Sequence, residues 1–247
     1  MKHLISRREF QNRRALNAKK LGKNNSLFKK ALKVKVEANN KYYWVSLTDW
    51  FGEPCLQLTT DLFGLQEAIY KSRPDYIIES GVAWGGSTLF YLNLCKVLGL
   101  KGVIGVDTYI PKDLKKRLNI KKPSGTFLKL FEGSSTDITI FKKIKKILKN
   151  KKAMVILDSD HTHDHVLNEL NLYSKIIKKN QYLICGDTII AYQPKAKSRP
   201  REWTRKKNPL SALKVFLKKN TNFKNDESIQ NKLLLTNMPN GWLKKIK

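Results

Sequence analysis

Short apolar runs that end in small or acidic residues constrain the fold of this chain most strongly. The run at residues 153–157 is followed at 158–165 by three carboxylates, three imidazoles, a serine and a threonine. An apolar run of this length, bounded by polar residues, indicates a strand buried on both faces. Open α/β sheets carry their ligand-binding groups beyond the carboxyl ends of such strands. The sequence therefore predicts a buried strand whose end carries functional groups.

Similar runs recur along the chain and alternate with amphipathic segments. Strands are expected at residues 76–79, 102–107, 126–131, 153–158 and 181–185, and helices at 61–72, 87–98, 137–148, 164–178 and 209–219. This alternation predicts an α/β fold with a mostly parallel sheet and helices on both faces. The chain should close with an antiparallel hairpin formed by residues 232–236 and 242–246.

The charge of the chain is extreme, with 49 Lys and Arg against 20 Asp and Glu in 247 residues, a net charge of +29. Such a balance favours an acidic partner, such as nucleic acid, an anionic membrane surface or a phosphorylated glycan. Alternatively, compositional bias produces many lysines that only solvate helix faces. The charge leaves both alternatives open.

Residues 1–40 are basic and lack periodic hydrophobic positions, so we expect a helical or partly disordered extension before a globular domain at 41–247. The extension would lie on a membrane surface, cover a neighbouring subunit or have no fixed partner. No apolar run approaches the roughly 18–20 residues of a membrane span. The N-terminus lacks a secretory signal, and three scattered cysteines argue against a disulfide framework. These features favour the cytoplasm.

A glycine-rich turn links the first expected strand to its helix. Gly81, Gly85 and Gly86 allow the backbone to turn tightly and to approach a ligand. Asp107 ends the second strand, where an acid can accept hydrogen bonds from ribose hydroxyls. The structural alternative is a turn without a ligand, with Asp107 capping the next loop.

A second group of small residues follows the third strand. Gly133, Ser134 and Ser135 leave room for an adenine ring at this loop. The same residues also suit a helix cap, because serine oxygens accept hydrogen bonds from free backbone N–H groups. Both readings are compatible.

Carboxylates follow the fourth and fifth strands. Asp158 and Asp187 should lie near each other because neighbouring parallel strands end at the same edge, and such oxygen ligands suit Mg²⁺. His161 is our candidate general base, and Asp160 is the next candidate. We expect His163 and His165 at the surface or behind the site.

Taken together, these blocks resemble the cephalosporin hydroxylase / rhamnosyl O-methyltransferase family. The resemblance runs from about Trp50 to Lys247 and rests on residues 52–57, 61–63, 73–75, 79–87, 103–107, 132–137, 157–161, 187–188 and 233–236. It implies a Rossmann-like class I methyltransferase fold with a seven-stranded sheet and S-adenosylmethionine as methyl donor. It also makes a homo-oligomer plausible.

The resemblance further implies roles for individual residues. Glu79, Gly81, Gly85, Gly86, Ser87 and Asp107 would hold the methyl donor. Asp158 and Asp187 would bind a divalent cation, with His161 beside the acceptor hydroxyl of a sugar, glycolipid or small natural product. Such an acceptor would suit an enzyme of lipid or polysaccharide biosynthesis.

One position departs from the family pattern. Gly186 stands where a glutamate usually precedes the aspartate, so either Asp160 or water would fill the gap, or binding of Mg²⁺ would be weakened. A glutamate introduced at this position would restore the ligand pair if the pocket has room.

Three other readings remain open. An RNA methyltransferase or nucleic-acid binder would use the basic loop 195–207 with Trp203. An oxygenase would use His161 and His163 beside Asp158 as iron ligands. A scaffolding protein with a decayed site is the third reading, motivated by Gly186.

Overall fold

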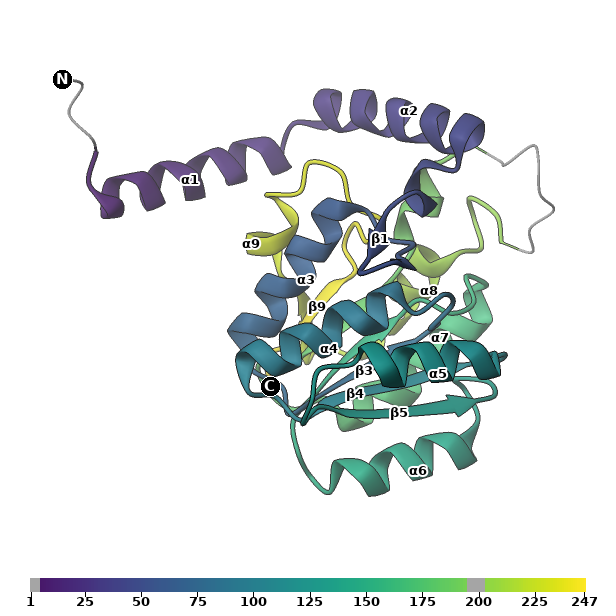
Figure 1. Cartoon of the computed structure of the whole chain (residues 1–247). Coiled ribbons are helices and arrows are strands. Elements are labelled where there is room, and N and C mark those ends of the chain that lie inside the picture. The colour runs from purple at the N-terminus through teal and green to yellow at the C-terminus, as the bar shows by residue number, and fades with distance from the viewer. Residues whose placement is uncertain (1–4, 195–202) are drawn as a thin grey trace.

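The computed structural model describes residues 5–194 and 203–247, which form a seven-stranded sheet between helices and an N-terminal helical arm (Figure 1). The strands are β3 (Tyr76–Ser80), β4 (Gly102–Asp107), β5 (Phe127–Glu132), β6 (Ala153–Leu157), β7 (Tyr182–Cys185), β8 (Phe223–Asn225) and β9 (Trp242–Lys245). The sheet order is β5-β4-β3-β6-β7-β9-β8. Strands β3 to β7 pair in parallel, whereas β9 is antiparallel to both β7 and β8. The predicted mostly parallel sheet is confirmed.

Helices cover both faces of this sheet, as predicted, and bury a hydrophobic core on each. Helices α3 (Thr59–Ser72), α4 (Gly86–Leu98) and α5 (Lys112–Lys121) share one core with side chains such as Ile77. Helices α6 (Ile138–Leu148), α7 (His163–Tyr173) and α8 (Pro209–Lys219) share the other core with Ile78. Alternate residues of one strand thus enter opposite cores, because successive side chains of a strand point to opposite faces.

Short elements complete the chain. They are the pair β1 (Asp49–Trp50) and β2 (Glu53–Pro54), the helix α9 (Glu227–Gln230), and the 3₁₀ helices η1 (Trp44–Ser46), η2 (Ser174–Ile176) and η3 (Thr188–Tyr192). Strands β1 and β2 pair with each other rather than with the main sheet. Among the described residues, no helix combines the length and the apolarity that crossing a membrane requires.

The C-terminal antiparallel pair exists, but the residues predicted for its first strand were wrong. Strand β9 pairs with Phe223–Asn225, not with residues 232–236. Residues 232–236 instead form turns over the start of α3, where the Thr60 hydroxyl donates to the Leu235 carbonyl. Leu233 is buried among the core side chains beside α3. Its segment is therefore apolar because it covers a helix, not because it joins a sheet.

The basic N-terminal residues form two helices, α1 (Arg7–Gly22) and α2 (Asn25–Tyr42). They make an arm that extends across one end of the molecule (Figure 1). Ser6 and Asn24 cap the two helices by accepting hydrogen bonds from Glu9 and Leu27 backbone N–H groups. The side chains of α1 are mostly exposed, whereas α2 turns one face toward the domain.

Candidate functional site

The predicted site residues gather at the carboxyl edge of the parallel strands. The register aligns Ser80 with both Val106 and Leu157, and Leu157 with Cys185. The residues that follow these positions therefore emerge side by side: the glycine-rich turn after β3, Asp107 at the end of β4, Asp158 after β6 and Asp187 after β7. This edge of an open α/β sheet is where ligands bind.

Asp158, His161 and Asp187 form the centre of the site. Each offers one ligand atom, and these atoms lie within 4.8 Å of one another. His161 Nε2 is 3.1 Å from Asp187 Oδ2. Burial and the neighbouring Asp187 carboxylate both raise the pKa of Asp158, so a cation placed between the carboxylates would relieve their repulsion. Two carboxylates and an imidazole at this spacing fit a divalent cation.

Asp160 does not enter this cluster. Its Oδ1 atom accepts a hydrogen bond of 2.6 Å from the Thr162 backbone N–H at the start of α7. Burial would raise the pKa of Asp160, but the hydrogen bonds from Thr162, together with the nearby His165 and His161, outweigh burial and lower the pKa. The position next to Asp158 and Asp187 is therefore taken by His161, and Asp160 serves to begin the helix.

The glycine-rich turn lies against the same cluster. Gly81 has a φ of +92°, and a Cβ there would lie 2.2 Å from the Asp158 carbonyl oxygen, so the turn cannot carry a larger residue. Asp107 Oδ2 accepts hydrogen bonds of 2.8 and 2.9 Å from the backbone N–H groups of Val82 and Ala83. Gly85, with a φ of +85°, begins α4. Asp107 therefore holds the turn, with its Oδ1 atom less tightly engaged by Thr108 and Tyr109.

Three predicted donor-binding residues lie behind this turn rather than facing open space. Glu79 is buried and accepts hydrogen bonds from the hydroxyls of Ser87, at 2.5 Å, and Thr88. Burial raises the pKa of Glu79 to about 7. Gly86 lies against β2, where a Cβ would be 2.4 Å from the Pro54 carbonyl oxygen. Glu79, Gly86 and Ser87 thus support the turn from inside the protein.

The loop after β5 is tied to the same edge. The Gly133 backbone N–H donates to the Asp107 carbonyl oxygen at 2.8 Å, and the Ser134 hydroxyl lies 2.8 Å from that of Thr136. Ser135 is buried, and its hydroxyl lies 2.9 Å from His165 Nε2. The Ser159 hydroxyl continues this internal network to Glu169 at 2.9 Å. Ser135 is thereby engaged by the protein itself, and His165 lies behind the site as expected.

Two side chains that the sequence did not predict for the site, Gln57 and Trp203, contact the cluster, and a third, Lys35, interacts with it electrostatically. Gln57 donates to Asp158 Oδ2 at 2.6 Å, and its position inside a recognised sequence block was the available signal. The Trp203 ring packs edge-on against His161, with ring centroids 5.0 Å apart. Lys35, on α2, is 6% exposed and interacts electrostatically with Asp187 and Asp61. Because Lys35 is one of many lysines in a basic segment, nothing in the sequence distinguishes it as a buried residue.

The structure also shows the surroundings of Trp203 and His163, on which the nucleic-acid and oxygenase readings depended. Trp203 packs on His161 and is partly buried rather than fully exposed for stacking on bases. Most of its basic loop, residues 195–202, lies outside the described residues. His163 Nδ1 is 2.6 Å from the Ser211 hydroxyl, and His163 does not join Asp158 and His161 in the metal-competent cluster of the described residues. The two-histidine iron site therefore does not form.

Comparisons with known proteins agree with this fold. The family described as Rhamnosyl O-methyltransferase/CmcI matches residues 41–246. A rhamnosyl O-methyltransferase of Mycobacterium bovis is 31% identical over 216 residues, covering 84% of this chain and 83% of the relative. One from Mycobacterium leprae is 32% identical over 166 residues, covering 64% and 69%.

Solved structures resemble the chain at lower sequence identity. An apo structure of CmcI superposes with a TM-score of 0.58 at 20% identity, covering 82% of this chain and 77% of that one. A CmcI structure with Mg and SAM gives 0.56 at 20% identity, covering 82% and 78%. At this identity the likeness shows the fold. With the sequence match over most of its length, the chain belongs to the rhamnosyl O-methyltransferase/CmcI family of class I methyltransferases.

Proposed function

We propose that this protein transfers a methyl group from S-adenosylmethionine to a hydroxyl group of a sugar, glycolipid or small natural product, with a divalent cation at Asp158 and Asp187. One observation carries the proposal. The cluster of Asp158, His161 and Asp187 lies at the same sheet edge as the glycine-rich turn and Asp107. A donor site and a deprotonating site side by side are what methyl transfer to a hydroxyl needs.

The residues of the donor side fit a nucleoside. The turn after β3 has left-handed backbone at Gly81 and Gly85, which lets a ligand approach the main chain closely. Asp107 fixes the turn through Oδ2, and its Oδ1 atom, which accepts only longer hydrogen bonds from Thr108 and Tyr109, would accept from the ribose hydroxyls. Glu79 and Ser87 contribute indirectly, by fixing the first turn of α4. S-adenosylmethionine itself supplies the electrophilic methyl group.

The residues of the acceptor side fit proton removal. The imidazole of His161 is oriented by its contact with Asp187 and by the Trp203 ring against its face. We propose that this imidazole takes the proton of the acceptor hydroxyl as a general base. A divalent cation at Asp158 and Asp187 would make that hydroxyl more acidic. Gln57 holds the Asp158 carboxylate in place by donating to its Oδ2 atom.

Calorimetry tests the donor and the cation separately. S-adenosylmethionine should bind the purified protein. Mg²⁺ should bind without the donor, and binding should be lost in Asp158→Asn and Asp187→Asn. A folded protein that takes up neither ligand would refute the proposal.

Partners and location stay predictions. Nucleic-acid binding through the basic surface, peripheral membrane contact of the N-terminal arm, homo-oligomerisation and a cytoplasmic location follow from sequence reasoning alone. The packing of Trp203 against His161 favours the small-molecule acceptor over an RNA-stacking role for that ring.

A further inference from the structure

Helix α7 presents a row of polar side chains to the protein interior behind the site. His165, Glu169 and Tyr173 are spaced by four residues, so they lie on one face of the helix. Glu169 and Tyr173 are buried, His165 is partly buried, and the Tyr173 hydroxyl donates to the Ser135 carbonyl oxygen at 3.0 Å. A helix face that packs on a core is normally apolar, so this polar row calls for an explanation.

The carboxylate of Glu169 is the meeting point of the row. Its Oε1 atom accepts hydrogen bonds from the Ser80 hydroxyl at 2.5 Å and the Ser159 hydroxyl at 2.9 Å. His165 Nε2 lies 3.7 Å from the same oxygen, and it is 2.9 Å from the Ser135 hydroxyl and 3.3 Å from that of Ser159. Three serine hydroxyls therefore converge on two side chains of α7.

Each of the three serines belongs to a different loop of the site. Ser80 ends β3 directly before the glycine-rich turn, Ser135 lies in the small-residue loop after β5, and Ser159 directly follows Asp158. The turn after β3 belongs to the proposed donor site, and the loop after β6 belongs to the proposed cation site. Glu169 therefore contacts both sites, each through one serine hydroxyl.

Stability alone does not account for this network. The Oε2 atom of Glu169 is buried and has no hydrogen-bond partner within residues 5–194 and 203–247. A buried carboxylate oxygen without a partner costs stability, and buried ionic groups in general add little to it. The carboxylate is therefore better explained by the loops that it joins.

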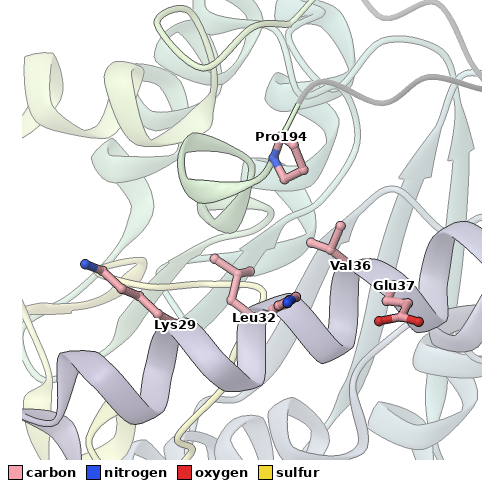
Figure 2. Close-up of a pocket in the computed structure, with 6 residues that line it drawn as sticks. Lys29, Leu32, Val36, Glu37 and Pro194 are labelled. Atoms are coloured by element: carbon pink, nitrogen blue, oxygen red, sulfur yellow. The ribbon is translucent and has the colours of Figure 1, made fainter.

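The geometry also excludes a reactive serine. An imidazole that activates a serine binds the hydroxyl through one nitrogen and the carboxylate through the other. Here the same atom, His165 Nε2, faces both Ser135 and Glu169. No member of the network lines the cavity of about 330 Å³ between α2 and Pro194 (Figure 2) or the one of about 320 Å³ beside α3. The arrangement suits the joining of loops rather than chemistry on a bound molecule.

We propose that Glu169 and His165 are positioning residues that couple the donor site to the cation site. They hold the turn after β3 and the loop after β6 in one mutual arrangement, so a ligand that orders either loop also favours the bound arrangement of the other. Such coupling is reciprocal, because Mg²⁺ and the donor raise each other's affinity by the same factor. The inference rests on the proposed function and adds the residues that set its two sites against each other.

Calorimetry on the full chain measures the coupling without a known acceptor. S-adenosylhomocysteine is titrated into the protein with and without Mg²⁺, and Mg²⁺ is titrated with and without S-adenosylhomocysteine. This ligand is chosen because it lacks the positive sulfonium charge of the methyl donor, which would itself repel the cation. The second ligand should raise the affinity about fivefold or more in both titrations, as coupling between two sites typically does.

Two substitutions of Glu169 separate hydrogen bonding from packing. Glu169→Leu keeps much of the side-chain volume but accepts no hydrogen bond, so the rise in affinity should shrink to about twofold or less. Glu169→Gln keeps an oxygen that accepts from Ser80 and Ser159, so most of the coupling should remain. Tyr182→Phe is the matched control, because it removes a buried hydrogen bond to Asp226 at the other end of β7 and should leave the coupling at its parental value.

Ser159→Ala provides a second route if circular dichroism shows that Glu169→Leu does not fold. It removes only the hydroxyl that joins the cation loop to Glu169 and His165, so it should reduce the coupling in the same direction.

Two results would overturn the inference. One is independent binding of S-adenosylhomocysteine and Mg²⁺ by the parent protein. The other is parental coupling in folded Glu169→Leu or, where that variant does not fold, in Ser159→Ala. A parent protein that binds neither ligand would instead refute the proposed function, so the two failures are distinguishable.

Discussion

His161 Nε2 lies 3.1 Å from Asp187 Oδ2, so the residues proposed as base and as cation ligand are in direct contact. The contact joins the loop after β6 to the residue after β7. It gives His161 an orienting carboxylate, and it also places the imidazole where a cation ligand would be. Mutations must separate these two roles.

Replacing His161 by alanine distinguishes base from ligand. If the imidazole moves the proton, turnover should fall about 10²–10⁴-fold, the usual contribution of a general base. Donor affinity and Mg²⁺ affinity should stay close to those of the parent protein. His163→Ala is the matched control, because His163 bonds Ser211 outside the cluster. Full activity of His161→Ala on a confirmed acceptor would show that the base assignment is wrong.

Replacing Asp107 by alanine should weaken S-adenosylmethionine binding at least tenfold, since hydrogen bonds to charged groups contribute about 1.5–3 kcal/mol each. The change also frees the Val82 and Ala83 backbone N–H groups and loosens the turn. Asp75→Ala is the control, because Asp75 accepts from the Lys152 backbone N–H beside the opposite ends of β3 and β6. Calorimetry should show reduced affinity for the first variant alone; an unchanged value would remove Asp107 from the donor site.

Gly186→Glu should weaken cation binding, although the family pattern suggested a restored ligand pair. A Cβ at Gly186 would lie 2.6 Å from Asp158 Oδ1 and 2.6 Å from the Leu157 carbonyl oxygen. The backbone oxygen cannot move aside as a flexible side chain can, so Asp158 would be displaced. Overpacking of this kind costs about 1–3 kcal/mol of stability. Gly186→Ala should show a smaller effect in the same direction. Tighter Mg²⁺ binding by Gly186→Glu in a calorimetric titration would contradict this expectation.

The buried Glu79 should make stability fall between about pH 4.5 and pH 7. Burial raises the pKa of Glu79 from 4.5 to about 7, so the folded state holds a proton that the unfolded chain releases in this range. Stability decreases with pH wherever the folded state binds more protons, here by about 3 kcal/mol in all. Urea unfolding at pH 5 and pH 8 should show a smaller difference for Glu79→Gln than for the parent. The exposed Glu132→Gln should keep the parental difference, and an unchanged difference in Glu79→Gln would disprove the effect.

The sequence by itself determined the sheet and the edge that carries the site. Buried strands such as Ala153–Leu157 are recognisable in the sequence as apolar runs, because a strand covered on both faces has no solvent-exposed side that would carry polar residues. Once those strands are parallel, the residues after them must meet at one edge. The proximity of Asp158 and Asp187 therefore followed from chain order and strand direction alone.

The tertiary structure decided which partner each polar side chain meets. Ser87 turns inward to Glu79, residues 232–236 cover α3 instead of joining the sheet, and Lys35 is buried although its segment looks merely basic. Periodicity records only whether a segment has a buried side. The identity of the neighbour depends on packing between segments far apart in the chain, such as Phe28 of α2 against Tyr192 of η3, and no local pattern encodes that contact.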